Sequence, residues 1–263
     1  MARLVVSRHR RVTLANLALA FPDLSDPVRR RLARQAWQHL GMTLVELARL
    51  LDRPLEATLQ ELTLEGTEHL REVMRRHGRA LVLTAHLGNW EYLAAVHRLI
   101  GHPVAIVVRP LDSPTLAKVA AAMRGKTGIE LIDKRGALRP VLMALRQGGV
   151  VAVLLDQNAT RREGVFVPFF GRDASTSRSL ALLALRTGTP IVPIFIRREG
   201  PGRHRVVIQA PLSPPPSNNL ERAVVELTAR CTATIEAAIR KAPEQWLWSH
   251  DRWRTRPPAD APV

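Results

Sequence analysis

Two hydrophobic periods alternate along this chain, one typical of buried strands and the other of helices. Short apolar runs bounded by Gly, Pro or polar residues predict strands, whereas apolar residues at three- and four-residue spacing predict helices. Strands are expected at residues 62–65, 80–85, 104–108, 129–132, 150–155, 191–196 and 205–209. Helices are expected at residues 26–51, 67–77, 92–99, 113–124, 136–147, 176–187 and 219–241. This alternation predicts an α/β fold with a mixed, mostly parallel central sheet flanked by helices.

Several predicted helices carry start or stop signals. Asp26 is a typical N-cap and is followed by Pro27, which suits the first helical position. Gly78 is expected to end the helix at 67–77, and Thr176 is expected to cap the helix that reaches about Thr187. These signals fix the helix boundaries more firmly than periodicity alone.

One main domain is expected over residues 1–263, with an N-terminal helical part at 1–61, an α/β core at 62–256 and a frayed tail at 257–263. Residues 1–24 pass from a basic start to an apolar lead-in that includes Leu17. Two interpretations of this lead-in stay open, a packed N-terminal arm and a segment that lies on a membrane.

The best candidate for chemistry is the run from Ala85 to Glu91, which joins the strand at 80–85 to the following helix. Ligands bind at the carboxyl edge of open α/β sheets, and Gly88 permits a tight turn and the close approach of a substrate. His86 would lie in the turn, and Glu91 in the first helical turn could hold one imidazole tautomer and stabilise the imidazolium. The alternative is structural: a capping Glu and a His bonded to the backbone.

Charge adds an expectation about partners. The formal net charge is +16 and the isoelectric point is about 11.5, so an anionic partner is expected: nucleic acid, an anionic membrane surface, or an acidic or phosphate-bearing substrate. The single Cys231 excludes an internal disulfide framework. The start of the chain lacks the apolar core of a signal peptide, and no apolar stretch is long enough to span a membrane.

Familiar catalytic and metal-binding motifs do not occur in this sequence. It contains no G-x-S-x-G elbow, no H-E-x-x-H and no Cys/His cluster with zinc spacing. We therefore expect no metal and no cofactor.

Several short motifs do occur together and in order. They are His86-Leu-Gly-Asn-Trp-Glu91, Arg109-Pro110, Asp156-Gln157, Gly164-Val-Phe-Val-Pro-Phe-Phe-Gly171 with Ala174 and Thr176, Gly188-Thr-Pro-Ile-Val-Pro193, and Pro243-Glu-Gln-Trp-Leu-Trp248. The set resembles the bacterial lipid A late acyltransferases, the lauroyl and myristoyl transferases within the wider lysophospholipid acyltransferase superfamily. The similarity runs from about Asn16 to Arg256.

The resemblance implies a glycerol-3-phosphate acyltransferase-like fold and a role for each motif. His86 and Glu91 occupy the family's H-x4-E pair, in which His86 deprotonates the acceptor hydroxyl that attacks an acyl thioester. Arg109 and Asp156 fall in the second and third active-site motifs, and an Arg suits a phosphate. The expected substrate-binding residues are Arg109, Arg124, Asp156, Gln157, Phe169, Phe170, Gly171 and Thr176. The Phe side chains suit an acyl-chain tunnel and an ordinary core equally well.

Two features depart from the family's pattern. The family usually carries an apolar membrane anchor before this region, and almost nothing precedes it here, so either the protein binds peripherally or the natural chain is longer. The Arg-Pro-x-x-Asn-Pro form is replaced by Arg109-Pro-Leu-Asp-Ser113-Pro114. The second departure leaves the acceptor open, since related glycolipid acyltransferases, including those acting on phosphatidylinositol mannosides, share much of the pattern.

The primary hypothesis is an O-acyltransferase that moves a fatty acyl chain from acyl carrier protein or coenzyme A to a lipid A precursor or similar glycolipid. It is expected at the cytoplasmic face of the bacterial inner membrane, where each Lys or Arg near anionic lipid contributes about 1 kcal/mol. The alternatives are a phosphatidylinositol mannoside or lysophospholipid acyltransferase, a thioester or lipid hydrolase, and a basic nucleic-acid-binding protein. A nucleic-acid-binding protein would carry exposed aromatic residues among its basic residues. The chain has one Tyr and no RNP-like run, so no nucleic acid is expected as a partner.

Overall fold

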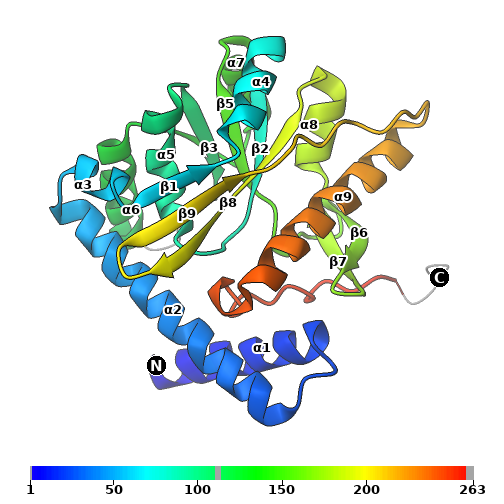
Figure 1. Ribbon diagram of the computed structural model, residues 1–263. Coiled ribbons are helices and arrows are strands. Elements are labelled where there is room, and N and C mark those ends of the chain that lie inside the picture. Colours follow the sequence, from blue (N-terminus) through cyan, green and yellow to red (C-terminus); the bar gives the residue numbers. More distant parts are fainter. Residues whose placement is uncertain (1, 110–113, 259–263) are drawn as a thin grey trace. The chain divides into compact units, whose positions relative to one another are not determined.

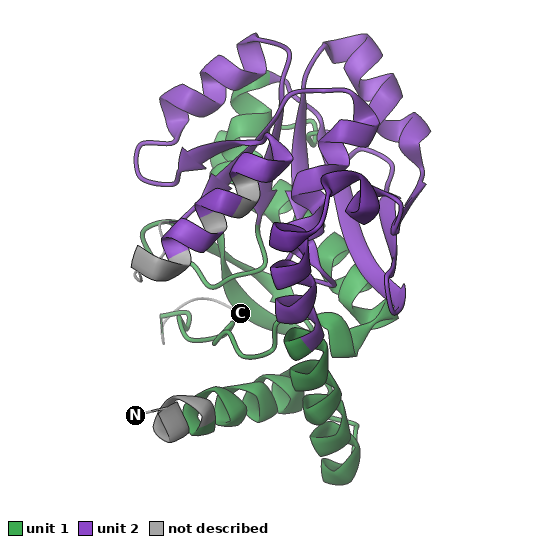
Figure 2. Ribbon diagram, turned by 90° about the vertical axis from the view of Figure 1, so that its left-hand side faces the viewer, with its two compact units in different colours: residues 1–41, 155–187, 214–263 green, residues 42–154, 188–213 purple. Residues whose placement is uncertain are grey.

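The computed structural model describes residues 2–109 and 114–258 (Figure 1). The chain divides into two compact units (Figure 2). Unit 1 comprises residues 1–41, 155–187 and 214–263, and unit 2 comprises residues 42–154 and 188–213. The first of the four places where the chain passes between the units lies within one helix, α2 (Asp26–Asp52). The expectation of one domain divided at residues 61 and 62 stays a prediction.

Unit 2 is built on a seven-stranded sheet in the order β1-β9-β8-β2-β5-β3-β4. The strands are β1 (Leu62–Glu65), β2 (Ala80–Thr84), β3 (Val104–Val108), β4 (Glu130–Asp133), β5 (Val150–Leu154), β8 (Ile191–Gly200) and β9 (Arg203–Ile208). All neighbours are parallel except β8 and β9, which form an antiparallel hairpin. The predicted mixed, mostly parallel sheet is confirmed, and each predicted strand occurs within a few residues of its expected position.

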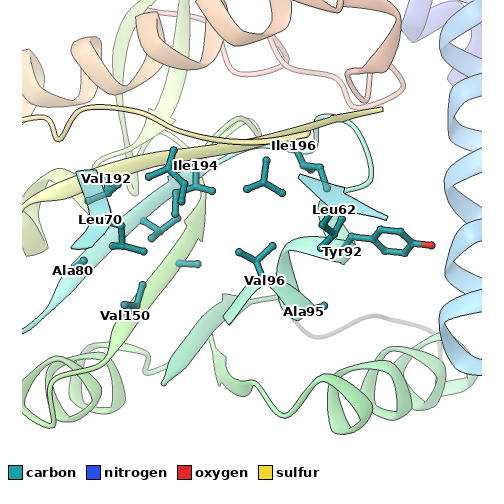
Figure 3. Close-up of a cluster of buried hydrophobic side chains, with 14 of the residues drawn as sticks. Leu62, Leu70, Ala80, Tyr92, Ala95, Val96, Val150, Val192, Ile194 and Ile196 are labelled. Carbon is teal, nitrogen blue, oxygen red and sulfur yellow. The ribbon is translucent and has the colours of Figure 1, made fainter. Parts of the chain in front are cut away.

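The central strand β2 is buried on both faces, which explains its unbroken apolar sequence. Leu81 and Leu83 are fully buried on one face, whereas Ala80 and Val82 join a core cluster on the other. Figure 3 shows this cluster, which alternate residues of β5, β8 and β9 extend across the sheet. At roughly 1.5–3 kcal/mol for each fully buried large aliphatic side chain, this core is a major stabilising contribution to unit 2.

Helices complete the cluster. α4 (Thr67–His77) contributes Leu70, Val73 and Met74, whose spacing places them on one helical face. It ends where predicted, at Gly78, which adopts φ 65° and donates its backbone N–H to the carbonyl oxygen of Met74 at 2.8 Å. The other helical elements in unit 2 are α3 (Leu55–Leu59), η1 (Trp90–Tyr92), α5 (Leu93–Ile100), α6 (Pro114–Thr127) and α7 (Leu138–Arg146).

Unit 1 contains a hairpin that the sequence pattern did not predict. Its strands are β6 (Gly164–Phe169) and β7 (Arg172–Ser177), joined by Phe170 and Gly171 at φ 51° and 70°. Two successive residues at positive φ form the turn that matches the twist of paired strands. Thr176 lies in β7, so the prediction that it caps a helix is wrong, because strand pairing extends to Ser177. The helix, α8, begins at Ser179 and ends at Thr187.

The N-terminal lead-in is a helix, α1 (Ala2–Ala20), whose last turns pack inside unit 1. Leu17 is fully buried, and Asn16 Nδ2 donates to the carbonyl oxygens of Trp248 and His250 at 2.8 and 2.6 Å. The packed-arm interpretation is confirmed for these residues. Unit 1 also contains α9 (Leu220–Lys241) and η2 (Pro243–Gln245). Asn219 caps α9, because its Oδ1 accepts a 3.0 Å bond from the Arg222 N–H. The predicted frayed tail at 257–263 lies mostly outside the described residues.

Candidate active site

The candidate active-site loop follows the central strand of unit 2, as predicted. β2 ends at Thr84, and the turn that follows carries half-buried His86 to the carboxyl edge of the sheet. Half-buried Glu91 lies in η1, a single 3-10 turn, rather than in the first turn of the α-helix. The His86 ring contacts the indole of Trp90 edge-on, with ring centroids 5.2 Å apart. The loop therefore presents an imidazole and a carboxylate in one short segment.

Gly88 lets this loop lie directly against the sheet. It adopts φ 62°, and a Cβ atom there would lie 2.2 Å from the carbonyl oxygen of Ile196 in β8. Real Cβ atoms do not approach an oxygen so closely, so any side chain at this position displaces either the loop or β8. The close approach at Gly88 is thus made by the backbone of Ile196 and not by a substrate.

A buried charged cluster holds the loop from another side. Asn89 is fully buried, and its Nδ2 donates to Glu46 Oε2 at 2.8 Å. Arg198 donates to the same carboxylate through Nε and Nη2, at 2.9 and 2.5 Å, and His204 Nε2 lies 3.3 Å from Glu46 Oε1. Burial alone would raise the pKa of Glu46, but the contacts with His204 and Arg198 outweigh it and lower the pKa to about 2. Glu46 is therefore ionised at neutral pH.

The cluster also affects Tyr92, the residue after Glu91. Burial, reinforced by the negative charge of Glu46, raises the pKa of Tyr92 to about 12, and its hydroxyl donates to the backbone oxygen of Glu46 at 3.4 Å. The sequence pattern does not reveal this cluster, because Glu46 and Arg198 are far apart in the chain. A charged residue within the apolar pattern of the 26–51 helix was the available signal.

An apolar cavity of about 50 Å³ lies in unit 2 beside this loop. Its walls come from the sheet, from Trp90 and from α5: Val82, Thr84, Trp90, Leu93, Val96, His97, Ile100, Val104, Ile106, Val150, Ala152, Leu154 and Ile194. Trp90 thus lines the cavity and contacts His86. Thr84 Oγ1 is buried without a hydrogen-bond partner among the described residues. The cavity has room for about four water-sized groups and suits a short run of methylenes.

Two predicted substrate-binding arginines also belong to unit 2. Arg109 is exposed directly after β3, at the same sheet edge as the end of β2. Arg124 lies in α6. Pro110 and Ser113 of the Arg-Pro motif lie outside the described residues. The placement leaves Arg109 open to a charged ligand, and the substrate contacts of both arginines stay predictions.

The remaining predicted site residues belong to unit 1, and most are buried there. Asp156 accepts a 2.8 Å hydrogen bond from Trp246 Nε1, and Phe169 packs on Trp246 and Trp253. Phe170 packs on Trp248, and its N–H donates to Glu236 Oε2 at 2.6 Å. Gly171 lies in the hairpin turn, and Gln157 is exposed. The Phe rings are part of the aromatic core of unit 1, as the alternative interpretation expected.

Thr176 has an equally internal environment. It is fully buried, and its Oγ1 accepts a 2.5 Å hydrogen bond from Nη2 of Arg252, which also donates to the carbonyl oxygen of Ser175 at 2.7 Å. Burial lowers the pKa of Arg252 to about 10. These contacts give Thr176 a structural role within unit 1, and substrate binding by the six unit 1 residues stays a prediction.

Two further properties of the described residues bear on the site. No helix within residues 2–109 and 114–258 is long and apolar enough to cross a membrane. The same residues hold no group of three or more His, Cys, Asp or Glu side chains arranged to bind a metal ion.

Comparison with known proteins identifies the family. The family model for bacterial lipid A biosynthesis acyltransferases matches residues 1–255. The chain is 28% identical over 254 residues to the lipid A biosynthesis lauroyltransferase of Escherichia coli K12, covering 96% of this chain and 81% of that protein. It is 25% identical over 251 residues to the myristoyltransferase of the same organism, covering 95% and 77%. A solved structure, the 1-acyl-sn-glycerophosphate acyltransferase PlsC of Thermotoga maritima, is similar with a TM-score of 0.42, 13% identity, and coverage of 92% and 99%.

The family model and the lauroyltransferase define the class of protein as an acyltransferase. The chain belongs to the bacterial lipid A biosynthesis acyltransferase family, as its motifs predicted.

Proposed function

We propose that this enzyme transfers a fatty acyl chain from a thioester, acyl carrier protein or coenzyme A, to a hydroxyl of a lipid A precursor. The observation that carries the proposal is the position of His86 and Glu91 on one loop at the carboxyl end of β2, beside an apolar cavity. The family and its named relatives support the choice of glycolipid acceptor.

His86 serves as the general base. It removes the proton of the acceptor hydroxyl as the oxygen attacks the thioester carbonyl carbon, and the carbon–sulfur bond then breaks. The departing sulfur recovers the proton from the imidazolium, so an ester and a free thiol result. Glu91 orients the imidazole and stabilises its charged form. The reaction requires no nucleophilic Ser or Cys.

The acyl chain would enter the cavity lined by Trp90 and Thr84. Its apolar walls favour methylenes over water, and the contact between Trp90 and His86 puts the base at the cavity's edge. The unpartnered hydroxyl of Thr84 can donate to a polar atom at the head of the chain. A pocket of limited depth would then make the enzyme selective for acyl-chain length.

We also propose peripheral attachment at the cytoplasmic face of the bacterial inner membrane, driven by charge. Exposed arginines on α1 and in the first half of α2 support it: Arg8, Arg10, Arg11, Arg30, Arg31 and Arg34. Leu17 in the apolar lead-in is fully buried inside unit 1 and adds no apolar contact with a membrane, whereas Leu14 and Phe21 are half-buried. Electrostatic attraction of these arginines to anionic lipid is the main contribution to the proposed attachment.

The test is an acyl-transfer assay with purified protein, labelled acyl-carrier-protein and coenzyme A donors, and a panel of lipid acceptors, with products identified by mass spectrometry. The proposal expects ester formation on a lipid A precursor and little free fatty acid. Acylation only of a lysophospholipid or a phosphatidylinositol mannoside would replace the acceptor, and release of free fatty acid alone would identify a hydrolase. Activity should be unchanged in the presence of a chelator, since attack on a thioester needs a base and oxyanion donors but no metal. A chelator that abolishes activity, with recovery on adding zinc or magnesium, would contradict this expectation.

A further inference from the structure

Glu46 enters the interior of unit 2 from α2 and forms a buried ion pair. Its side chain is 10% exposed, and that of its partner Arg198 on β8 is 5% exposed. Two bonds join the guanidinium to the carboxylate, Nε to Oε1 and Nη2 to Oε2. Such a pair adds little stability over a well-packed apolar pair, yet loss of one partner leaves a costly buried charge. Stability alone therefore does not explain why a carboxylate is placed here.

The same carboxylate is bonded to the loop that carries His86 and Glu91. Asn89, between these two residues, donates to Glu46 Oε2, and Tyr92, just after Glu91, donates to the Glu46 backbone oxygen. One residue of α2 thus holds the segment on both sides of Glu91.

Packing alone does not favour an asparagine at position 89. Its side chain is fully buried, and its Oδ1 has no hydrogen-bond partner among the described residues. An unsatisfied buried amide oxygen carries a desolvation penalty, which an apolar side chain of similar shape would avoid. The bond from Asn89 Nδ2 to Glu46 offsets part of this cost and fixes the loop in one orientation.

We propose that Glu46 is a positioning residue: through Asn89 it holds the loop so that His86 and Glu91 are correctly placed for proton transfer. This inference rests on the proposed role of His86. Arg198 keeps the Glu46 carboxylate ionised and oriented, so the chain of contacts runs from β8 through α2 to the active-site loop.

The experiment compares two double variants that differ only in the acceptor offered to Asn89. Glu46→Gln with Arg198→Met removes the charge pair but keeps an oxygen for Asn89, whereas Glu46→Leu with Arg198→Met removes that oxygen. Neither leaves an unpaired Arg charge. We expect the Leu variant to lose about a hundredfold in kcat relative to the Gln variant, with KM for the acyl donor unchanged, because displacement by about 1 Å is enough for such a loss.

Thr43→Val is the matched control. Thr43 Oγ1 accepts a 3.3 Å bond from Arg198 Nη2, so Thr43 contacts the ion pair. It does not take part in the bond between Glu46 and Asn89. It should keep the wild-type kcat. If the double variants do not fold, Asn89→Leu decides the matter: it removes the tether, leaves the ion pair intact, and should lower kcat to the same extent with KM unchanged. A kcat for Asn89→Leu equal to that of wild type would overturn the proposal.

Equal kcat values for the two folded double variants would also overturn it. The activity of His86→Ala separates this failure from failure of the proposed function. If His86→Ala is inactive while the double variants are equal, only the positioning role fails. If His86→Ala keeps its activity, the mechanism fails and the positioning role fails with it.

Discussion

Replacing Gly88 by Ala should both destabilise the protein and slow acyl transfer. An Ala at φ 62° costs roughly 1–2 kcal/mol in the left-handed region. In addition, its Cβ would lie 2.2 Å from the Ile196 oxygen and 2.8 Å from the Ile196 carbonyl carbon. Ordinary contact requires the loop and β8 to separate by about 1 Å, and overpacking of this kind typically costs about 1–3 kcal/mol.

Gly101→Ala is the matched control for this substitution. Gly101 caps α5 at φ 73°, but a Cβ there meets nothing within 4 Å, so this variant carries only the backbone cost. We therefore expect Gly88→Ala to be less stable than Gly101→Ala by about 1–3 kcal/mol in urea denaturation. A shift of about 1 Å in the active-site loop should also lower kcat about a hundredfold, with Gly101→Ala near wild type.

Two results would refute this reasoning. Equal stability of the two Ala variants would show that the loop does not lie against β8 as described. Full activity of Gly88→Ala at reduced stability would show that the exact position of the loop is not needed for catalysis.

The remaining predictions concern the loop, the cavity, the charged cluster and the membrane. Glu91→Gln should lower kcat less than loss of the base does, because an amide still orients an imidazole; equal losses would give Glu91 a larger role. Ala152→Leu adds bulk inside the cavity and should shift the preferred donor to shorter acyl chains in a chain-length series. Val151→Leu, which is outside the cavity lining, should leave the preferred chain length unchanged. An unchanged preference in Ala152→Leu would show that the acyl chain binds elsewhere. Glu46, with a pKa lowered to about 2 from an ordinary 4.5, should contribute stability that is fully present above pH 4.5 and is lost as the pH falls toward 2, about 3 kcal/mol in all. Denaturation of the wild type and of the double variant Glu46→Leu with Arg198→Met across this pH range checks it, and an equal acid sensitivity would disprove it. The protein should co-sediment with anionic vesicles, bind neutral ones poorly and be released by high salt, since charge is screened over about 8 Å at physiological salt; retention on neutral vesicles at high salt would show apolar insertion.

Local patterns predicted the sheet and most helices because each depends on nearby residues. The unbroken apolar run at Ala80–Thr84 predicts a strand that is buried on both faces. The end of α4 at Gly78 is predictable because glycine readily adopts the left-handed conformation found there. The β6–β7 hairpin was missed because its turn places Phe170, an aromatic residue, at positive φ, where Gly or Asn is usual. The same omission produced the wrong cap at Thr176.

Part of the candidate site was also predicted, because that part depends on residues close together in the chain. His86 and Glu91 lie on one short loop, so their proximity follows from the chain itself. The bond between Glu46 and Asn89 joins residues 43 positions apart, and the pair with Arg198 spans 152 positions. Such contacts depend on tertiary packing, which no local period encodes.

The role of His86 as general base is tested most directly by comparing the acyl-transfer rates of His86→Ala and His77→Ala. His77 is an exposed histidine at the end of α4 in the same unit, so its loss should change little. The mechanism predicts that His86→Ala keeps its thermal unfolding midpoint but loses about a hundred- to ten-thousandfold in kcat, the usual contribution of a general base. A His86→Ala enzyme that folds normally and transfers acyl chains within a few-fold of wild type would show that His86 is not the general base.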